Sequence, residues 1–202
     1  MKEKFLMIGL ILLIACQSNS KTDSPKPADE SQDNSTGKIN NQLTNQASAL
    51  TVINFLKWYK GNYETIYQYN LVNNAGGEYD STKFYSVNFK ETEKYLSKLK
   101  SGGFISDSYI EGWRKYFIER EENFKSNLQN DGPPDGFEYD FVLMTQEIDE
   151  TLNSIDNPKL INVSESSDSS VVKIDIMMRL SFSLRKNNNI WLIDRIENLG
   201  ME

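Results

Sequence analysis

The sequence contains no histidine and only one cysteine, Cys16, among its 202 residues. The absence of histidine removes the commonest general base and the commonest metal ligand of proteins, together with every Ser-His or Cys-His catalytic pair. A single cysteine cannot form an internal disulfide bond, a redox pair or a zinc site built on several thiolates. Carboxylates are therefore the only abundant side chains of a catalytic type.

Basic side chains are outnumbered by acidic ones, 22 against 29, which gives a net charge of -7 at pH 7. An acidic surface repels a phosphate backbone, so the composition argues against nucleic acid as a partner. Hydrophobic residues make up 38% of the chain, enough for the core of one domain, while a mean hydropathy of -0.57 indicates that much of the chain is solvated.

The first 16 residues read MKEKFLMIGLILLIAC. Lys2 and Lys4 precede an apolar run from Phe5 to Ala15, which is too short for a transmembrane helix of about 20 residues. A short apolar run after a positive start is typical of a signal peptide, so we predict that residues 1–15 are removed during export.

The last four of these residues, Leu13-Ile14-Ala15-Cys16, resemble the bacterial lipobox. The resemblance implies that Cys16 receives lipid and becomes the first residue of the mature protein; several acyl chains together anchor a protein stably to a membrane. Gln17, in place of Asp, favours the outer membrane of the cell envelope. The alternative is an ordinary secretory signal with an incidental cysteine.

A polar segment follows the lipobox. Residues 17–48 consist mainly of Ser, Asn, Gln, Asp, Lys, Thr and Pro, and such a composition cannot bury enough apolar surface to offset the entropy of ordering. We predict a disordered tether over residues 16–48, with a reach of roughly 30 Å, and a folded domain over residues 49–202.

Apolar residues recur with helical spacing in the first part of this domain. They predict one helix that is capped by Ser48 and ends at Gly61, a second from the capping pattern at Asn88 to the Gly102-Gly103 break, and a third over residues 106–128. Residues 62–87 are ambiguous, and residues 130–136 form a loop rich in Gly and Pro.

The C-terminal part changes to alternation with a period of two. Seven of seven even positions from Val172 to Leu184 are apolar, which predicts one long strand over residues 172–185 with a single buried face. The pattern predicts an antiparallel meander, which also includes a turn at 186–189, a returning strand over 190–196 and a further strand over 159–165. Helices followed by a meander are typical of the α+β class, with the helices packed on a curved antiparallel sheet.

Three segments resemble an uncharacterised family of NTF2-like domains found largely in bacterial lipoproteins. They are Phe55-Leu56-Lys57-Trp58-Tyr59, the acidic-aromatic region with Asp140-Phe141 and residues 145–149, and Ile190-Trp191-Leu192-Ile193-Asp194. The chain departs from the family pattern at Gln146-Glu147, where Gln-Asp is usual. The resemblance covers most of residues 49–198 and implies a cone in which a curved sheet wraps one long and two shorter helices.

Such cones often enclose a ligand cavity, so aromatic and polar residues of the three segments are candidates for its lining. The candidate pocket residues are Trp58, Tyr59, Asp140, Gln146 and Trp191, and Tyr63 and Tyr67 extend the aromatic set. The alternative is that an aromatic stripe at helical spacing belongs to the core.

Two sets of acidic residues near residue 140 suggest further hypotheses, one about acid-base catalysis and one about a Ca²⁺ site. If residues 140–147 were helical, Asp140 and Glu147 would share a face and, with Asp149 nearby, would offer paired carboxylates for acid-base catalysis. Asp131, Asp135, Glu138 and Asp140 offer oxygen ligands for Ca²⁺, but their spacing does not fit the EF-hand loop. Solvated carboxylates, or a capping role for Asp140, are the simpler alternatives, and we assign no metal, cofactor or catalytic residue.

We therefore expect a lipid-anchored envelope module without enzymatic activity, binding a protein partner or a small ligand. An accessory subunit of an envelope complex and an inhibitor of a secreted toxin both fit this class. The alternative class is a carboxylate-dependent hydrolase or isomerase with its site in the cone.

Overall fold

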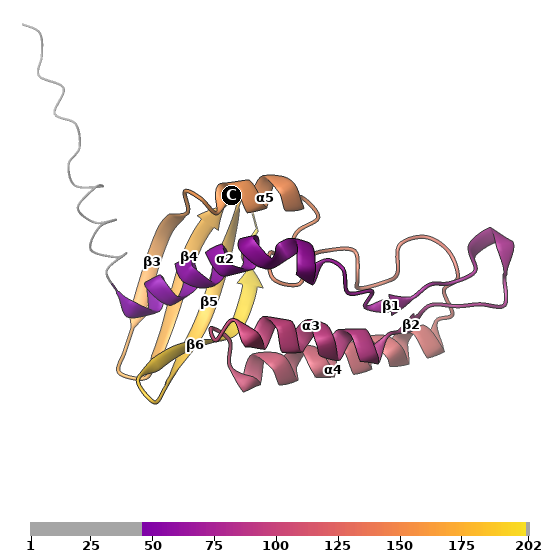
Figure 1. Cartoon of the computed structure of the whole chain (residues 1–202), viewed down its shortest axis with the longest axis horizontal. Coiled ribbons are helices and arrows are strands. Elements are labelled where there is room, and N and C mark those ends of the chain that lie inside the picture. Colours follow the sequence, from indigo (N-terminus) through magenta and orange to yellow (C-terminus); the bar gives the residue numbers. More distant parts are fainter. Residues whose placement is uncertain (1–45, 201–202) are drawn as a thin grey trace, which may run out of the picture. The chain divides into compact units, whose positions relative to one another are not determined.

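A computed structural model describes residues 46–200 of the chain. The predicted signal peptide (1–15), the predicted lipid attachment at Cys16 and the predicted tether as far as residue 45 lie outside these residues. The described part contains four α-helices and a four-stranded antiparallel sheet, so the α+β class is confirmed (Figure 1). None of the helices within residues 46–200 has both the length and the apolar character needed to cross a membrane.

The first helix, α2 (Ala47–Ile66), begins before and ends after its predicted limits. Ser48 is not the N-cap: it is buried within the first turn, and its hydroxyl donates a hydrogen bond of 2.5 Å to Glu165. Gly61 does not end the helix either. A glycine inside a helix costs about 1 kcal/mol, and burial of apolar residues before and after it, Tyr59 among them, outweighs that cost.

The next two helices begin close to their predicted positions, and the predicted cap at Asn88 is confirmed. The Asn88 side chain accepts a hydrogen bond from the backbone N–H of Glu91 at the start of α3 (Phe89–Ser101), and Ser106 plays the same part for α4 (Asp107–Ser126). Helix α4 stops short of the predicted end, and Leu128 is 64% exposed beyond it.

The region that the sequence left ambiguous holds two very short strands. β1 (Val72–Asn73) pairs with β2 (Ser86–Val87), and the single 3-10 turn η1 (Gly77–Tyr79) lies in the excursion between them. A fourth helix, α5 (Ile148–Ser154), was not predicted from the sequence.

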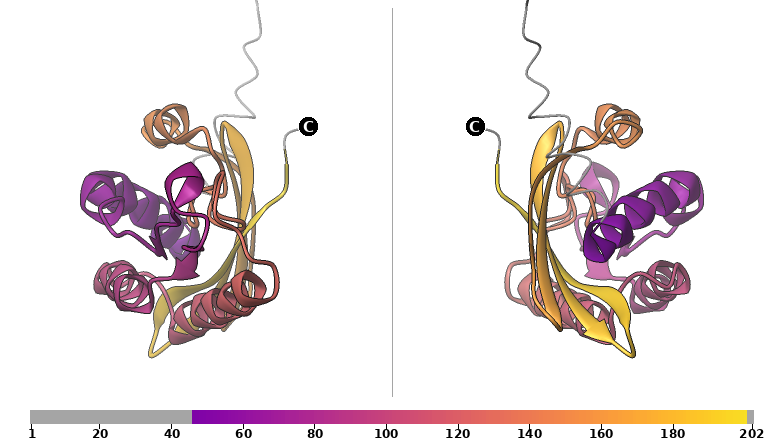
Figure 2. Two further views of the ribbon diagram at one scale, coloured as in Figure 1. Left: turned by 90° about the vertical axis from the view of Figure 1, so that its right-hand side faces the viewer. Right: turned by 90° about the vertical axis from the view of Figure 1, so that its left-hand side faces the viewer.

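The sheet is a meander in the order β3 (Lys159–Glu165), β4 (Ser169–Ile176), β5 (Met178–Asn187) and β6 (Ile190–Asn198). Figure 2 shows α2, α3 and α5 on one side of this sheet. Helix α2 packs against β4 and β6, and α4 packs against β6. A register shift within the β5–β6 pairing leaves Asp194 as an extra residue, and such a bulge bends a strand.

The predicted long strand over residues 172–185 is wrong, because the chain reverses at Met177. Ile176 of β4 pairs with Met178 of β5, and Met177 between them has a φ of 72°, close to that of the central residue of a γ-turn. The predicted buried face is nevertheless confirmed, since every even position from 172 to 184 is buried. A turn within the predicted range 186–189 is also confirmed, but it is confined to Asn188 and Asn189, which both have positive φ as a two-residue hairpin loop of type I′ requires; Lys186 and Asn187 belong to β5.

The reversal at Met177 leads to a prediction about two substitutions. Met177 is 47% exposed, so its replacement changes little packing. Glycine adopts positive φ without steric cost, whereas a β-branched residue does not, so we expect Met177→Gly to be more stable than Met177→Val by roughly 1–2 kcal/mol. Urea denaturation of the two variants measures the difference. A continuous strand would reverse the order, because strands favour Val and disfavour Gly.

Candidate functional site

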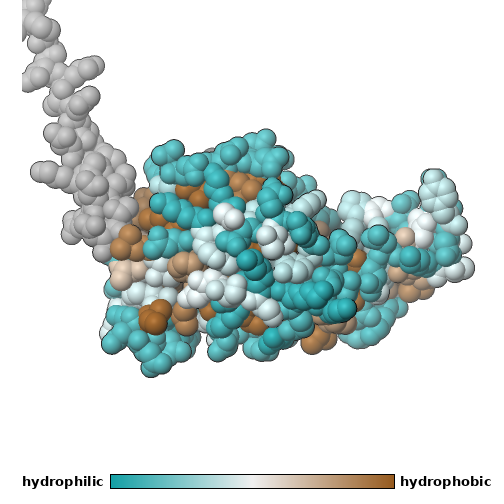
Figure 3. All heavy atoms as spheres, viewed as in Figure 1, coloured by the Kyte–Doolittle hydropathy of each residue, from teal (hydrophilic) through white to brown (hydrophobic). Residues whose placement is uncertain are grey.

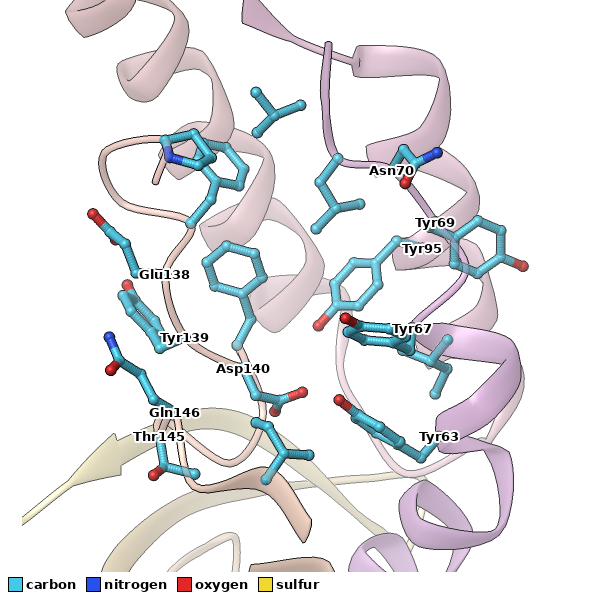
Figure 4. Close-up of a pocket in the computed structure, with 17 residues that line it drawn as sticks. Tyr63, Tyr67, Tyr69, Asn70, Tyr95, Glu138, Tyr139, Asp140, Thr145 and Gln146 are labelled. Atoms are coloured by element: carbon cyan, nitrogen blue, oxygen red, sulfur yellow. The ribbon is translucent and has the colours of Figure 1, made fainter. Parts of the chain in front are cut away.

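A cavity of about 480 Å³ opens between the C-terminal end of α2, helix α3 and the loop that precedes α5 (Figure 4). This volume lies within the range of small-molecule sites. Five of its lining residues are tyrosines: Tyr63, Tyr67, Tyr69, Tyr95 and Tyr139. The remainder are apolar residues, three neutral polar residues and two carboxylates, Glu138 and Asp140.

Two of the five candidate pocket residues, Asp140 and Gln146, line this cavity; the other three do not. Trp58 packs against Phe55, Phe104 and the end of α3, where a β-carbon on Gly102 would lie only 2.9 Å from its ring. Trp191 is 4% exposed in the core beside Lys186. The prediction that these three residues line the cavity is therefore not met: Tyr59 and Trp191 are buried in the core, and Trp58 is partly buried against it. An aromatic residue at helical spacing can belong to the core or to a cavity wall, and spacing alone does not distinguish the two.

Three tyrosines follow one face of α2 at intervals of four residues. Tyr59 is fully buried, and Tyr67 at the helix end is 73% exposed, so the row runs from the core to solvent. The rings of Tyr63 and Tyr67 stack with their centroids 5.7 Å apart, and Tyr63 meets Tyr59 edge to face at 5.9 Å. Residues four apart on a helix are neighbours, which is why this spacing produces a continuous aromatic wall.

Asp140 is held rigidly at the inner end of this wall. Its Oδ1 accepts hydrogen bonds from the backbone N–H groups of Val142 (2.9 Å) and Leu143 (2.6 Å), and its Oδ2 accepts one from the Tyr59 hydroxyl (2.5 Å). The loop closes where Asp140 N donates to Thr145 O at 2.9 Å. Residues 140–147 are therefore not helical, which corrects the hypothesis of a shared helix face for Asp140 and Glu147.

Burial dominates the electrostatics of Asp140. It raises the pKa of the carboxyl above its usual value, and the hydrogen bonds from Leu143 N, the Tyr59 hydroxyl and Val142 N oppose this effect without cancelling it. All three donors are uncharged, so the negative charge of Asp140 has no counter-ion among the residues that supply its hydrogen bonds.

The raised pKa predicts how stability depends on pH. A group whose pKa is higher in the folded state contributes stability that is present below its unfolded pKa, near 4, and lost as the pH rises through the folded value. Asn has the same shape and does not titrate. We expect the free energy of unfolding of Asp140→Asn, relative to wild type, to increase between pH 4 and pH 7, by roughly 1.4 kcal/mol for each unit by which the pKa is raised.

Urea denaturation at three pH values measures this difference. Glu93→Gln is a control of opposite sign, because the hydrogen bond from Arg114 lowers the pKa of Glu93. A difference between Asp140→Asn and wild type that stays constant or falls with rising pH would contradict the expected effect of burial.

Three tyrosines of the cavity, Tyr69, Tyr95 and Tyr139, were not predicted from the sequence, and Tyr95 is the most buried of them. It lies on α3, is 4% exposed, and its hydroxyl is buried without a hydrogen-bond partner among the described residues. Figure 4 shows this hydroxyl pointing into the cavity, toward the side where Asp140 lies. The spacing of Tyr95 from Thr92 and Leu99 places it on the buried side of α3. The loop that completes the cavity begins only near Pro134, so no local sequence pattern links Tyr95 to that loop.

The other carboxylates are not gathered around Asp140. Glu138 accepts a hydrogen bond from Gly136 N at 2.9 Å and points away from Asp140 (Figure 4). Asp135 pairs with Arg120, and Asp131 accepts from Gly132 N. Within residues 46–200 there is no group of three or more side chains able to hold a metal ion, so the four residues of the calcium hypothesis are not brought together.

No protein-family model, curated protein or solved structure matches this chain. The resemblance to NTF2-like domains therefore stays a prediction.

Proposed function

We propose that the chain is a lipoprotein of the bacterial cell envelope, anchored at Cys16 in the outer membrane, whose domain binds a small ligand without catalysing a reaction. The ligand-binding part of the proposal is supported mainly by the cavity. It is open in the folded domain, and its lining holds Asp140 in a fixed position and a buried Tyr95 hydroxyl that has no hydrogen-bond partner among residues 46–200. A buried polar group without a partner costs about 1–3 kcal/mol, a cost that a ligand can remove.

On the face that Figure 3 shows, the distribution of apolar surface favours a small ligand over a protein partner. On the face seen in Figure 3, apolar side chains lie in small separate groups among polar ones. Protein interfaces usually present a larger continuous apolar patch. A protein of the envelope is the second class of partner, and it becomes the favoured one if no small molecule binds in the cavity.

A carboxylate-dependent enzyme is the alternative function. Acid-base catalysis by two carboxylates needs both of them directed at one point with different pKa values. The raised pKa of Asp140 favours this alternative, but both of its oxygens already accept hydrogen bonds and Glu138 points away. We therefore rank binding above catalysis.

We also propose that the domain is a variant of the NTF2-like cone. The bent antiparallel meander, the helices on one side of it and the cavity beside α2 support this assignment. The three sequence segments that carry the resemblance remain its main basis.

The experiment is a thermal-shift screen of the mature chain against small amines, sugars, amino acids and organic acids. A ligand at 100 times its Kd stabilises the folded state by about 2.7 kcal/mol, so we expect one class to raise the Tm by several degrees. Gln146 lines the cavity and is exposed, and Gln146→Trp should abolish the shift by filling the cavity. Gln68→Trp, an exposed position of α2's C-terminal flank outside the lining, should leave it unchanged. A shift retained in Gln146→Trp, or none with any class, would contradict ligand binding in this cavity.

A further inference from the structure

The charge of the cavity lining limits the class of ligand. Two of the described lining residues, Asp140 and Glu138, carry a carboxylate, and none of the described lining residues is Lys or Arg. An anionic ligand would meet repulsion from Asp140 with no basic side chain in the wall to offset it. Ligands that depend on a phosphate or carboxylate group are therefore disfavoured.

The aromatic wall adds an attraction for positive charge. The faces of stacked Tyr63 and Tyr67 carry the negative part of the ring quadrupole, which attracts a cation within about 6 Å. The pKa of Tyr63 is raised to about 12, first by burial and then by the negative charge of Asp140, with smaller contributions from Tyr67, Asp149 and Glu64. The contributions of Asp140, Asp149 and Glu64 come from negative charges, which attract a cation, whereas burial disfavours a charge of either sign.

The hydrogen bonds still available at Asp140 and Tyr95 favour a cation over a neutral sugar as the ligand. A carboxylate offers about four acceptor sites, and three at Asp140 are taken by protein donors, so Asp140 supplies charge more than free acceptors. Sugars need several directional hydrogen bonds. The Tyr95 hydroxyl, buried and without a partner among the described residues, offers a lone pair to one N–H donor.

We propose that the cavity binds a small organic cation, a protonated aliphatic amine. Its charge is balanced by Asp140, one N–H donates to Tyr95, and its carbon chain lies against Tyr63 and Tyr67. This inference rests on the proposed ligand-binding function and names its chemical class.

The experiment uses the mature full-length chain and matched probes of different charge. Putrescine is compared with 1,4-butanediol, its neutral counterpart, and glucose and inorganic phosphate represent the rival classes. Binding is followed by calorimetry and by NMR of ¹³C-labelled tyrosine rings, since five of the ten tyrosines line the cavity. We expect putrescine to shift the signals of cavity tyrosines and to bind at least ten-fold more tightly than butanediol, with an affinity that falls as salt is added.

Three variants test the named contacts. Asp140→Asn should weaken putrescine at least ten-fold. Tyr95→Phe should weaken it several-fold while leaving tetramethylammonium, which has no N–H, unaffected. Because a change at Asp140 can impair folding, Gln146→Lys adds a positive charge at the exposed rim instead and should weaken putrescine, whereas Gln68→Lys should not.

Each outcome supports or overturns a specific statement. Equal binding of putrescine and butanediol, or tighter binding of glucose or phosphate with shifts of the same tyrosines, would overturn the cation inference while leaving ligand binding in the cavity intact. If neither these probes nor any compound of the screen changes the tyrosine signals, the proposed function fails together with the inference.

Discussion

Replacing Leu180 with Asp is expected to unfold the domain. Leu180 lies on β5, an interior strand, and is fully buried between its pairing partners Ile174 and Asn198. Removal of a buried leucine side chain costs about 2–5 kcal/mol, and an unpaired carboxyl in its place adds several more. A domain of this size is stable by about 5–15 kcal/mol, so the loss is comparable with the whole free energy of unfolding.

The measurement is the near-ultraviolet circular dichroism and the urea transition of the variant. Ser183→Asp is the matched control, because Ser183 lies on the same strand with its side chain on the opposite face and is only half-buried. We expect the control to change the free energy of unfolding by less than about 1 kcal/mol. A Leu180→Asp variant with an unchanged urea midpoint would show that this face of β5 does not lie in the core.

Replacing Cys16 with Ser is expected to remove the protein from the membrane, or to leave it as an uncleaved precursor. Without the thiol no lipid can be attached by a thioether, and the loss of two or three acyl chains removes, at about 0.8 kcal/mol for each buried methylene, almost all of the binding energy. Membrane fractionation and the mass of the mature protein measure both effects. Ser18→Ala, two residues away, should leave localisation unchanged.

The single cysteine offers a second test of the same anchor. Cys16 is the only thiol of the chain, so lipidated protein should contain no thiol that reacts with maleimide after denaturation. A processed Cys16→Ser protein retained in membranes at the wild-type level would contradict lipid attachment at this residue. Full maleimide reactivity of the membrane-bound wild type would do the same.

The hairpin at Met177 shows why local pattern identified the buried face but not the strands. A turn centred on residue 177 pairs each residue with the one equally far on the other side, so Ile174 meets Leu180 and Val172 meets Phe182. Paired residues face the same side of a sheet, and even positions therefore stay buried through the turn. The alternation is identical for one strand and for two, and neither Gly nor Pro marks the reversal.

The candidate site was likewise predictable only in part from the sequence. The aromatic row of α2 and the acidic loop around Asp140 were recognisable in the sequence, because spacing and composition are local properties. That Tyr59 donates to Asp140, 81 residues away, is decided only when α2 and the loop pack together. Trp58 and Trp191 have the same chemical character as the wall residues, but Trp191 belongs to the core and Trp58 packs against it.

The sequence by itself determined the α+β class, the cap of α3, the start of α4, the buried face of β4 and β5 and a turn that includes Asn188-Asn189. It also predicts, from residues that the structure does not describe, the lipid anchor. Only the tertiary structure decided where α2 ends, that the alternating segment is a hairpin, and which aromatic residues enclose a cavity. The reason is that periodicity reports whether a side chain is buried, whereas a cavity depends on segments far apart in the chain meeting without filling the space between them.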